Sequence, residues 1–508
     1  MSGAGQRFKD FGINEPKYTL SIFQESVLEG IIKNFSISDD KFIFVMNEDD
    51  FKTYEFWIKS IIASLNLVAE IKVVKSHNKG PSFAVLACLD IIDKRSPVII
   101  NYCDFGWCWD YDDFKNEMSV SLAEGCVITY TGFHPHMLDN TNYGYLQCVG
   151  DSVIDYREKA CFTNDPMSEH ASSGTYFFRS GEILQKALEY QVANKLSVNG
   201  EYYISLAFQY FLNNSIPLKR YEIPFFFQLG TPSDYLLACQ WERDLSLLQC
   251  YQNKDLEYSG GLLILSGGRG QRFQAEGYSQ PKGGIRVFGK HMFEWPRYLF
   301  SLEMGACHVF SPSMGEVETE NPHDSVLRLD STTDGQATSA HLGITKFYST
   351  LNKMPFTIAP CDAICLLREP DKLSEMLNKC DMVVWTSPRY LPALKNPSAY
   401  GWVEVKNNII KRSFIKRDPK SENVEVITGA FSFKTINVFE ECYTSLVKNQ
   451  KKTNGEYYID DMISEALTNG MKVKALPVDS FICMGTPDEL KTLEYWYSAS
   501  QRKGIFNV

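Results

Sequence analysis

Glycine, arginine and lysine residues recur in one stretch with the spacing that a polyphosphate site requires. The residues from Gly268 to Lys282 read GRGQRFQAEGYSQPK and follow the apolar run GLLIL. An apolar run that leads through glycines towards a helix predicts a strand, a turn and a helix start whose free backbone N–H groups favour anions. Gly268 and Gly270 let the backbone approach a ligand, while Arg272 and Lys282 supply a forked and a point-like cation. This loop is therefore predicted to bind a polyphosphate.

The same loop occurs at the start of the chain, where MSGAGQRFKDFGINEPK spans Met1 to Lys17. The matched residues lie 265 positions before their counterparts and are Gly3, Gly5, Gln6, Arg7, Phe8, Pro16 and Lys17. A lone glycine loop is more often a simple tight turn, so the repetition is what makes the interpretation specific. No apolar run precedes the first copy. We expect either that the natural chain starts upstream of Met1 or that this half lacks a central strand.

Composition limits the class of protein. A chain of 508 residues with 44% hydrophobic and 22% charged residues predicts a globular protein of two or more domains. Its net charge of −11 disfavours nucleic-acid and anionic membrane surfaces. The sequence contains no signal-like segment and no run of 18 apolar residues, so it predicts neither secretion nor a membrane span. The fourteen cysteines include no C-x-x-C pair, which favours reduced thiols in a cytoplasmic protein over disulfides or zinc.

Further motifs recur in the same order in both halves. NGEYYI starts at Asn199 and again at Asn454, and GTP starts at Gly230 and again at Gly485, each pair 255 residues apart. VIINYCD in the first half corresponds to FTIAPCD in the second. Because ordered repeats of this length indicate duplicated structural units, we predict two homologous domains, at residues 1–255 and 256–508.

The elements between the motifs predict an α/β fold. Apolar runs such as KFIFVMN and PFTIAP alternate with stretches of helical period such as SFAVLACLDIIDK and SAHLGITKFYSTL. This alternation predicts a mainly parallel sheet covered by helices in each domain, with ligands at the carboxyl ends of the strands. Asp104 and Asp362 end apolar runs and should meet the phosphate loops there. A carboxylate in that position requires a cation or donor, although the N-cap of a helix is an alternative role.

These motifs resemble those of the sugar-phosphate nucleotidyltransferases, or nucleoside-diphosphate-sugar pyrophosphorylases, whose signature is an apolar strand, G-x-G-x-R-F and a later P-K. The family motifs occur in both halves, and the two copies together cover nearly the whole chain. The resemblance implies two tandem Rossmann-like (GT-A-like) domains. It also implies an enzyme that joins an NTP to a phosphorylated sugar or sugar-like molecule and releases pyrophosphate, chemistry that needs positioning and charge neutralisation but no protein nucleophile.

The resemblance also implies roles for individual residues. Mg²⁺ would be the cofactor, bound by Asp104 and Asp362. The catalytic cations would be Arg7, Lys17, Lys159, Arg272, Lys282 and Lys416, with the arginines on the β- and γ-phosphates. The nucleotide would contact Gly3, Gly5, Gly80, Gly268, Gly270, Gly335 and Gln336. The acceptor would contact Gly144, Glu158, Gly174, Glu201, Gly401, Gly429 and Glu456. Plain turns and exposed helix starts explain several of these glycines and glutamates equally well.

The chain departs from the family pattern at two places. Ile415 precedes Lys416 where the first half has Glu158 before Lys159. Gln228 and Cys483 stand where many members have a second metal-binding aspartate. The second departure resembles a subgroup found with capsule and surface-glycan genes. Because a strand precedes only the second loop, we expect the second domain to carry most of the NTP binding.

Two other functions stay open at this point. The first is a nucleotide-sugar-dependent glycosyltransferase, although neither Asp104-Phe105-Gly106 nor Asp362-Ala363-Ile364 forms a D-x-D motif. The second is a catalytically weak nucleotide-binding regulatory protein. The partners implied by the resemblance are an NTP and a small phosphorylated substrate, without nucleic acid or membrane, and a homo-oligomer is compatible with them. Neither the base nor the acceptor follows from the sequence.

Overall fold

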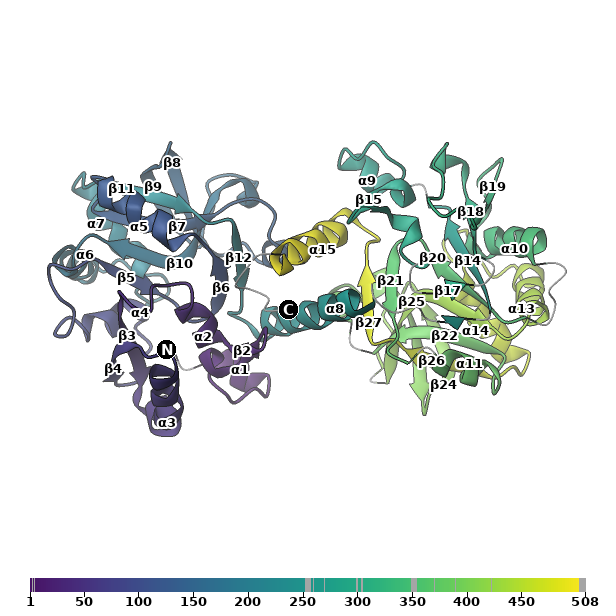
Figure 1. The fold of residues 1–508 in the computed structure, drawn as a ribbon, viewed down its shortest axis with the longest axis horizontal. Helices are drawn as coiled ribbons and strands as arrows, with labels where there is room; N and C mark the ends of the chain where they lie inside the picture. The colour runs from purple at the N-terminus through teal and green to yellow at the C-terminus, as the bar shows by residue number, and fades with distance from the viewer. Residues whose placement is uncertain are drawn as a thin grey trace. The chain divides into compact units, whose positions relative to one another are not determined.

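A computed structural model describes residues 1–501 of the chain, except 2, 4, 252–256, 259, 269, 298–299, 303–304, 349–353, 370, 389 and 422. The chain forms two compact units, of which unit 1 comprises Met1–Glu242 with Tyr495–Val508 and unit 2 comprises Arg243–Glu494 (Figure 1). The predicted boundary between residues 255 and 256 lies outside the described residues. Each unit has a sheet and a hydrophobic core of its own.

Unit 2 is organised around a mixed sheet, which has nine strands over the described residues, in the order β19-β18-β14-β20-β25-β22-β26-β24-β23. The strands are β14 (Gly261–Ser266), β18 (Ala306–Phe310), β19 (Ser325–Arg328), β20 (Phe356–Pro360), β22 (Met382–Ser387), β23 (Gly401–Lys406), β24 (Ile409–Ile415), β25 (Val424–Phe433) and β26 (Val473–Pro477). β19, β18, β14 and β20 are parallel, whereas β25 is antiparallel to both β20 and β22.

Unit 1 repeats part of this order. Its main sheet, six-stranded within the described part of the chain, runs β5-β10-β7-β11-β9-β8, which corresponds to β20-β25-β22-β26-β24-β23 of unit 2. The strands are β5 (Val98–Asn101), β7 (Gly125–Tyr130), β8 (Gly144–Val149), β9 (Ser152–Glu158), β10 (His170–Phe178) and β11 (Leu218–Glu222). A separate parallel pair joins β3 (Lys41–Asn47) to β4 (Val68–Val74). No described strand of unit 1 takes the place that β14 has in unit 2.

The prediction of mainly parallel sheets is wrong, because both sheets are mixed. β8 with β9, and β23 with β24, form antiparallel hairpins. Their turns contain residues with positive φ, namely Gly150 at 59°, Asn407 at 53° and Asn408 at 59°. Antiparallel neighbours can be joined by such tight turns, whereas parallel neighbours need a long crossover. The alternation of strands and helices in the sequence indicates only the connections between parallel strands. The prediction therefore missed the hairpins, and it missed β10 and β25, which lie antiparallel between two other strands.

Hydrophobic clusters join the strands to the helices in each unit. In unit 2 one cluster joins β14, β18, β20 and β22 to the helices α10 (Gln336–Phe347), α13 (Ile436–Lys448) and α14 (Ile459–Thr468). In unit 1 one cluster lies around β7, β10 and α6 (Gly181–Ala193). A separate cluster lies around β3, α2 (Val27–Ile32) and α3 (Glu48–Ser64). In unit 2 the strand β14 thus packs in the same cluster as β18, β20 and β22.

Two predicted helices end earlier than expected. The helix predicted over residues 82–94 is α4 (Pro81–Leu86), after which the chain turns towards β5. Asp93 stabilises that turn by accepting hydrogen bonds from the Arg95 backbone and the Ser96 hydroxyl. The helix predicted from residue 339 is α10, which ends at Phe347, and residues 349–351 lie outside the described part of the chain. In the part that the structure describes, no helix has both the length and the apolar composition of a membrane span.

Candidate active site

The glycine that precedes the short helix has the same backbone conformation in both units. Gly5 precedes α1 (Gln6–Asp10) with φ at 64°, and Gly270 precedes α9 (Gln271–Ala275) with φ at 62°. A positive φ is accessible to glycine at no steric cost. Gly5 thus keeps this conformation although no described strand precedes it.

A lysine, an aspartate and a backbone carbonyl meet in unit 1. Lys17 Nζ donates to Asp104 Oδ2 at 3.3 Å and to the carbonyl oxygen of Gly230 at 2.7 Å. The lysine follows the glycine loop, the aspartate follows β5, and Gly230 belongs to the GTP motif after β12 (Phe225–Gln228). Three segments that are distant in the sequence therefore converge on one ammonium group.

Unit 2 forms the same arrangement. Lys282 Nζ donates to Asp362 Oδ2 and, at 2.8 Å, to the carbonyl oxygen of Gly485. Burial alone would lower the pKa of Lys282. The attraction of Asp362 is stronger than this effect, so the pKa of Lys282 is raised. Burial alone would raise the pKa of Asp362. The attraction of Lys282 is stronger than this effect, so the pKa of Asp362 is lowered. The pair is therefore held ionised across neutral pH.

The two aspartates are not helix caps. Asp104 is followed by β6 (Phe105–Cys108) and Asp362 by β21 (Ala363–Leu366). The alternative role as an N-cap is therefore wrong. Both carboxylates lie instead between two strands and face the lysine of the glycine loop.

The donors available to a metal ion differ between the units. In unit 1, Gln228 Oε1 is buried without a hydrogen-bond partner among the described residues. A Cβ built on Gly230 would lie 3.3 Å from Gln228 Nε2 and 3.6 Å from Asp104 Oδ2, so the amide and the carboxylate face the same space. In unit 2, burial raises the pKa of the Cys483 thiol, which keeps it neutral.

These donors fit an ion that takes few protein ligands. Among the described residues, no group of three or more histidine, cysteine, aspartate or glutamate side chains could hold a metal. Mg²⁺ commonly binds one or two carboxylates and fills its other positions with water and phosphate oxygens. One carboxylate in each unit satisfies that requirement, and in unit 1 the amide of Gln228 lies beside it. A neutral thiol is a poor ligand for a hard cation.

The predicted arginines do not join the lysine and aspartate. Arg7 and Arg272 are exposed, and neither makes a hydrogen bond or an ion pair with another described residue. Both lie on the short helix after the loop. The structure thus leaves their guanidinium groups available to a ligand.

Gly80 and Gly335 have a role in packing. A Cβ on Gly80 would lie 2.6 Å from the backbone nitrogen of Tyr202, and one on Gly335 would lie 2.4 Å from that of Tyr457. Hydrogen bonds on both sides join these segments to the NGEYYI motif. Close backbone approach therefore explains both glycines without a ligand. Gln336 is the exposed first residue of α10.

The predicted acceptor residues of unit 1 come together. Gly144 on β8 is the cross-strand partner of Glu158 on β9. Lys159 Nζ donates to the Tyr203 hydroxyl at 2.7 Å, and that hydroxyl donates to Glu201. Lys159 has φ at 58° and its counterpart Lys416 has φ at 52°, an unusual conformation for lysine that recurs at matched positions.

The acceptor residues of unit 2 are arranged differently. Lys416 Nζ donates to the backbone oxygen of Ala399 at 2.5 Å. Gly174 and Gly429 lie inside β10 and β25 with φ at 92° and 88°, so they are not plain turns between elements. Glu201 and Glu456 each lie in an isolated β-bridge rather than at a helix start.

Sequence reasoning missed three kinds of functional candidate. The backbone oxygens of Gly230 and Gly485 receive the loop lysines, and the repeated GTP motif was the signal that marked them. Tyr203 connects Lys159 to Glu201. Asp460 follows the second NGEYYI motif and lies against Gly401.

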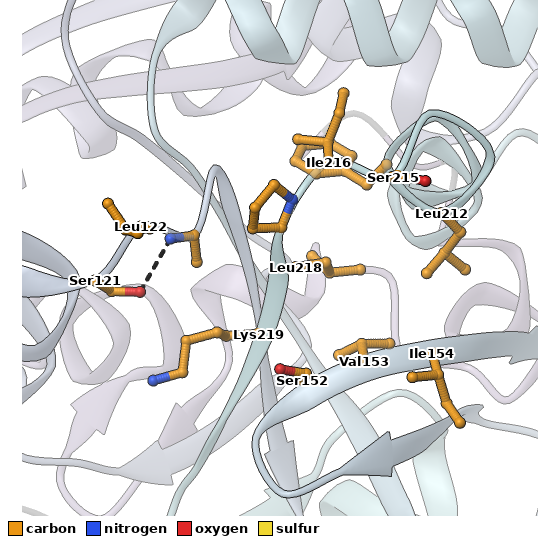
Figure 2. A pocket seen from close by; sticks show the side chains of 13 residues that line it. Ser121, Leu122, Ser152, Val153, Ile154, Leu212, Ser215, Ile216, Leu218 and Lys219 are labelled. Carbon is orange, nitrogen blue, oxygen red and sulfur yellow. Dashed lines mark hydrogen bonds between the residues drawn. The ribbon is translucent and has the colours of Figure 1, made fainter.

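A pocket of about 470 Å³ lies elsewhere in unit 1 (Figure 2). It is lined by residues at the start of β9 and β11 and in the loops that precede β7 and β11, including Leu122, Ile154, Ile216 and Lys219. β5 runs in the same direction as β7, since both are antiparallel to β10. The pocket is therefore at the amino ends of the strands, whereas Asp104 follows the carboxyl end of β5.

The chain matches no protein-family model and no curated protein. Solved structures that match it include a nucleoside-diphosphate-sugar pyrophosphorylase from Vibrio cholerae RC9, at 17% identity over 46% of this chain and 98% of that one, with a TM-score of 0.36. An inositol-1-phosphate CTP transferase from T. maritima matches at 18% identity over 48% and 97%, with a TM-score of 0.36. A UDP-glucose pyrophosphorylase complexed with UDP-glucose matches at 16% identity over 47% and 99%, with a TM-score of 0.37. At these TM-scores the matches support no assignment of activity.

Proposed function

We propose that this protein transfers a nucleotidyl group from an NTP to a phosphorylated sugar or sugar-like small molecule and releases pyrophosphate. The observation that carries the proposal is the contact of loop lysine, strand-end aspartate and glycine carbonyl, which occurs in both units. A glycine loop beside a half-buried lysine suits a polyphosphate, and an adjacent carboxylate suits the metal cation that accompanies a polyphosphate.

The reaction needs positioning more than covalent chemistry. An oxygen of the acceptor phosphate forms a bond to the α-phosphorus of the NTP, while the bond from that phosphorus to the bridging oxygen breaks and pyrophosphate leaves. In this proposal Lys282 or Lys17 would neutralise the α-phosphate, and the exposed Arg272 or Arg7 would bind the outer phosphates. When bound by Asp362 or Asp104, Mg²⁺ would supply further neutralisation of the phosphate oxygens.

The finer features of the function are part of the same proposal. We assign a GT-A-like arrangement to each unit and a cytoplasmic reaction to the enzyme. The positions two residues before the GTP motifs hold Gln228 and Cys483 instead of aspartate. This departure leads us to propose that the product serves capsule or surface-glycan synthesis.

Pyrophosphate release tests the proposal. The full chain is incubated with Mg²⁺, each of the four NTPs and a panel of sugar and polyol phosphates. Release should require one NTP and one acceptor together, and it should fall in a K282A variant but not in K411A, which changes an exposed lysine.

Three outcomes would contradict the proposal. Pyrophosphate release without an acceptor would indicate an NTP hydrolase. Transfer of sugar from a nucleotide sugar would indicate a glycosyltransferase. NTP binding without any turnover would indicate a regulatory protein.

A further inference from the structure

The two units carry a carboxylate at different positions around the predicted acceptor site. Glu158 precedes Lys159 in unit 1, whereas Ile415 precedes Lys416 in unit 2. The residue after NGEYYI is Ser205 in unit 1, whereas it is Asp460 in unit 2. Relative to unit 1, unit 2 has therefore lost a carboxylate at one position and gained one at another.

In unit 1 the carboxylate comes from the strand. Glu158 ends β9 and faces Gly144, its cross-strand partner, so that a Cβ on Gly144 would lie 3.0 Å from Glu158 Oε2. That oxygen accepts hydrogen bonds from Ser205 Oγ at 2.6 Å and from the Tyr156 hydroxyl at 3.2 Å. Both donors use Oε2, so Oε1 is left for another donor.

In unit 2 the carboxylate comes from a helix and reaches the same glycine position. Gly401 is the cross-strand partner of Ile415, as Gly144 is of Glu158. A Cβ on Gly401 would lie 2.5 Å from Asp460 Oδ2, an oxygen of the second residue of α14. The two carboxylates thus stand against equivalent glycines although they occupy non-equivalent positions in the sequence.

The surroundings of Asp460 suit a ligand rather than a structural contact. Its side chain is half-buried, and no other described side chain hydrogen-bonds its carboxylate. The next residue, Asp461, also lies in the first turn of α14 but accepts a hydrogen bond from Thr453 Oγ1 at 3.1 Å. A first-turn carboxylate can stabilise a helix through the dipole, and Asp461 shares that effect with Asp460.

We propose that Asp460 binds the hydroxyl groups of the acceptor in unit 2, in place of the glutamate that unit 1 has at position 158. An ionised carboxylate only accepts hydrogen bonds, so it selects a neutral polyhydroxylated phosphate whose hydroxyls donate. Lys416 is the cation that would bind the acceptor phosphate beside it. Because Glu158 and Asp460 approach from different elements, the two units bind different hydroxyls or different acceptors. This inference rests on the proposed function.

The test compares variants of the full chain in which E158Q removes the carboxylate of unit 1. In this background we measure pyrophosphate release as a function of NTP and acceptor concentration for the parent, D460N, D461N, D460S and I415E/D460S. D460N should raise the KM for the acceptor at least tenfold while leaving the KM for NTP and kcat within about threefold. D461N, the matched control on the same helix, should change neither KM more than about twofold.

The double variant I415E/D460S rebuilds the arrangement of unit 1 inside unit 2. It should bind the acceptor at least about threefold more tightly than D460S, because a carboxylate and its serine partner return to the same glycine. Equal effects of D460N and D461N, or an equal rise in both KM values for D460N, would overturn the inference. So would a failure of I415E to improve D460S.

Direct binding separates a failure of this inference from a failure of the proposed function. Should no NTP and acceptor pair release pyrophosphate, the proposed function is wrong. The inference is then decided by calorimetry with glucose 1-phosphate, glycerol 3-phosphate and inositol 1-phosphate. At least tenfold weaker binding to D460N than to the parent supports it. Equal binding, or no binding of any of the three to the parent, overturns it.

Discussion

Units 1 and 2 place the same lysine, aspartate and glycine in contact, yet the elements beneath that contact differ. In unit 2, β14 pairs with β18 on one side and β20 on the other, and Leu262, Leu263 and Ile264 are fully buried. In unit 1, β5 pairs only with β10 among the described strands, and all of its residues are half-buried. The contact thus forms in both units, although among the described residues a strand precedes the glycine loop only in unit 2.

The comparison shows that the contacts of lysine, aspartate and glycine carbonyl can stay the same while the strands next to them differ. Lys17 contacts Asp104 and the Gly230 carbonyl although no strand precedes its loop in the part of the chain that the structure describes. Unit 1 has the amide of Gln228 near Asp104, whereas unit 2 has the thiol of Cys483 near Asp362. The glycine loop that follows a described strand and the polar amide beside the aspartate therefore belong to different units.

Replacement of Asp362 by asparagine should have the largest effect. The variant removes the charge that faces Lys282 without changing volume, so pyrophosphate release by the full chain should fall at least ~100-fold if unit 2 carries the turnover. D104N should lower it by less than about threefold. Circular dichroism checks folding, and D330N, at an exposed aspartate, is the control. A halving of activity by D362N and by D104N would mean that the units turn over equally.

Loss of the loop lysine should have the next largest effect. K282A should weaken NTP binding by about 10- to 100-fold, because a charge-assisted hydrogen bond contributes about 1.5–3 kcal/mol. K17A should weaken it by less than about threefold if the loop of unit 1 contributes little. Calorimetry on the full chain measures both the affinity and the number of NTPs bound. Two NTPs per chain and equal losses in both variants would show that the units bind alike.

Asp460 should destabilise unit 2 at neutral pH, as expected of a binding residue held without a partner. Burial, with a smaller contribution from Asp461, raises the pKa of Asp460 to about 6, against the opposing effect of Lys416. The folded state therefore holds this proton more tightly than the unfolded state, and stability falls as pH rises from about 4 to about 6.

D460N should remove this pH dependence. Urea unfolding at pH 4 and pH 7 should show D460N gaining about 1–2 kcal/mol relative to the parent at the higher pH. D330N is the control. If D460N lost stability at pH 7, Asp460 would be a structural residue of α14.

Hydrogen exchange should give the smallest difference. β20 has neighbours on both sides, so its amides should be protected along the whole strand. The amides of β5 that point away from β10 have no described strand to bind, and we expect them to exchange at least about tenfold faster than the matched amides of β20. Equal protection of both strands would show that another segment pairs with β5.

Sequence reasoning predicted the elements better than their arrangement. The strands at KFIFVMN and GLLIL and the glycine turns lie where expected. Hairpins such as β23–β24 and the antiparallel insertion of β25 were missed, because strand composition does not indicate the direction of the neighbouring strand. In the candidate site, Lys282 and Asp362 were predicted to meet, whereas the Gly485 carbonyl that completes the contact was not.

The sequence by itself determined the repetition of the motifs, the two glycine loops, and the lysines and aspartates that could act on phosphates. These features follow from residue types at fixed local spacings, which set backbone conformation and charge. Only the tertiary structure decided that Asp460 reaches Gly401 from α14 and that β14 lies within one core but has no counterpart in the described part of the other. Both depend on packing between segments far apart in the chain, and local patterns carry no information about which distant segments pair.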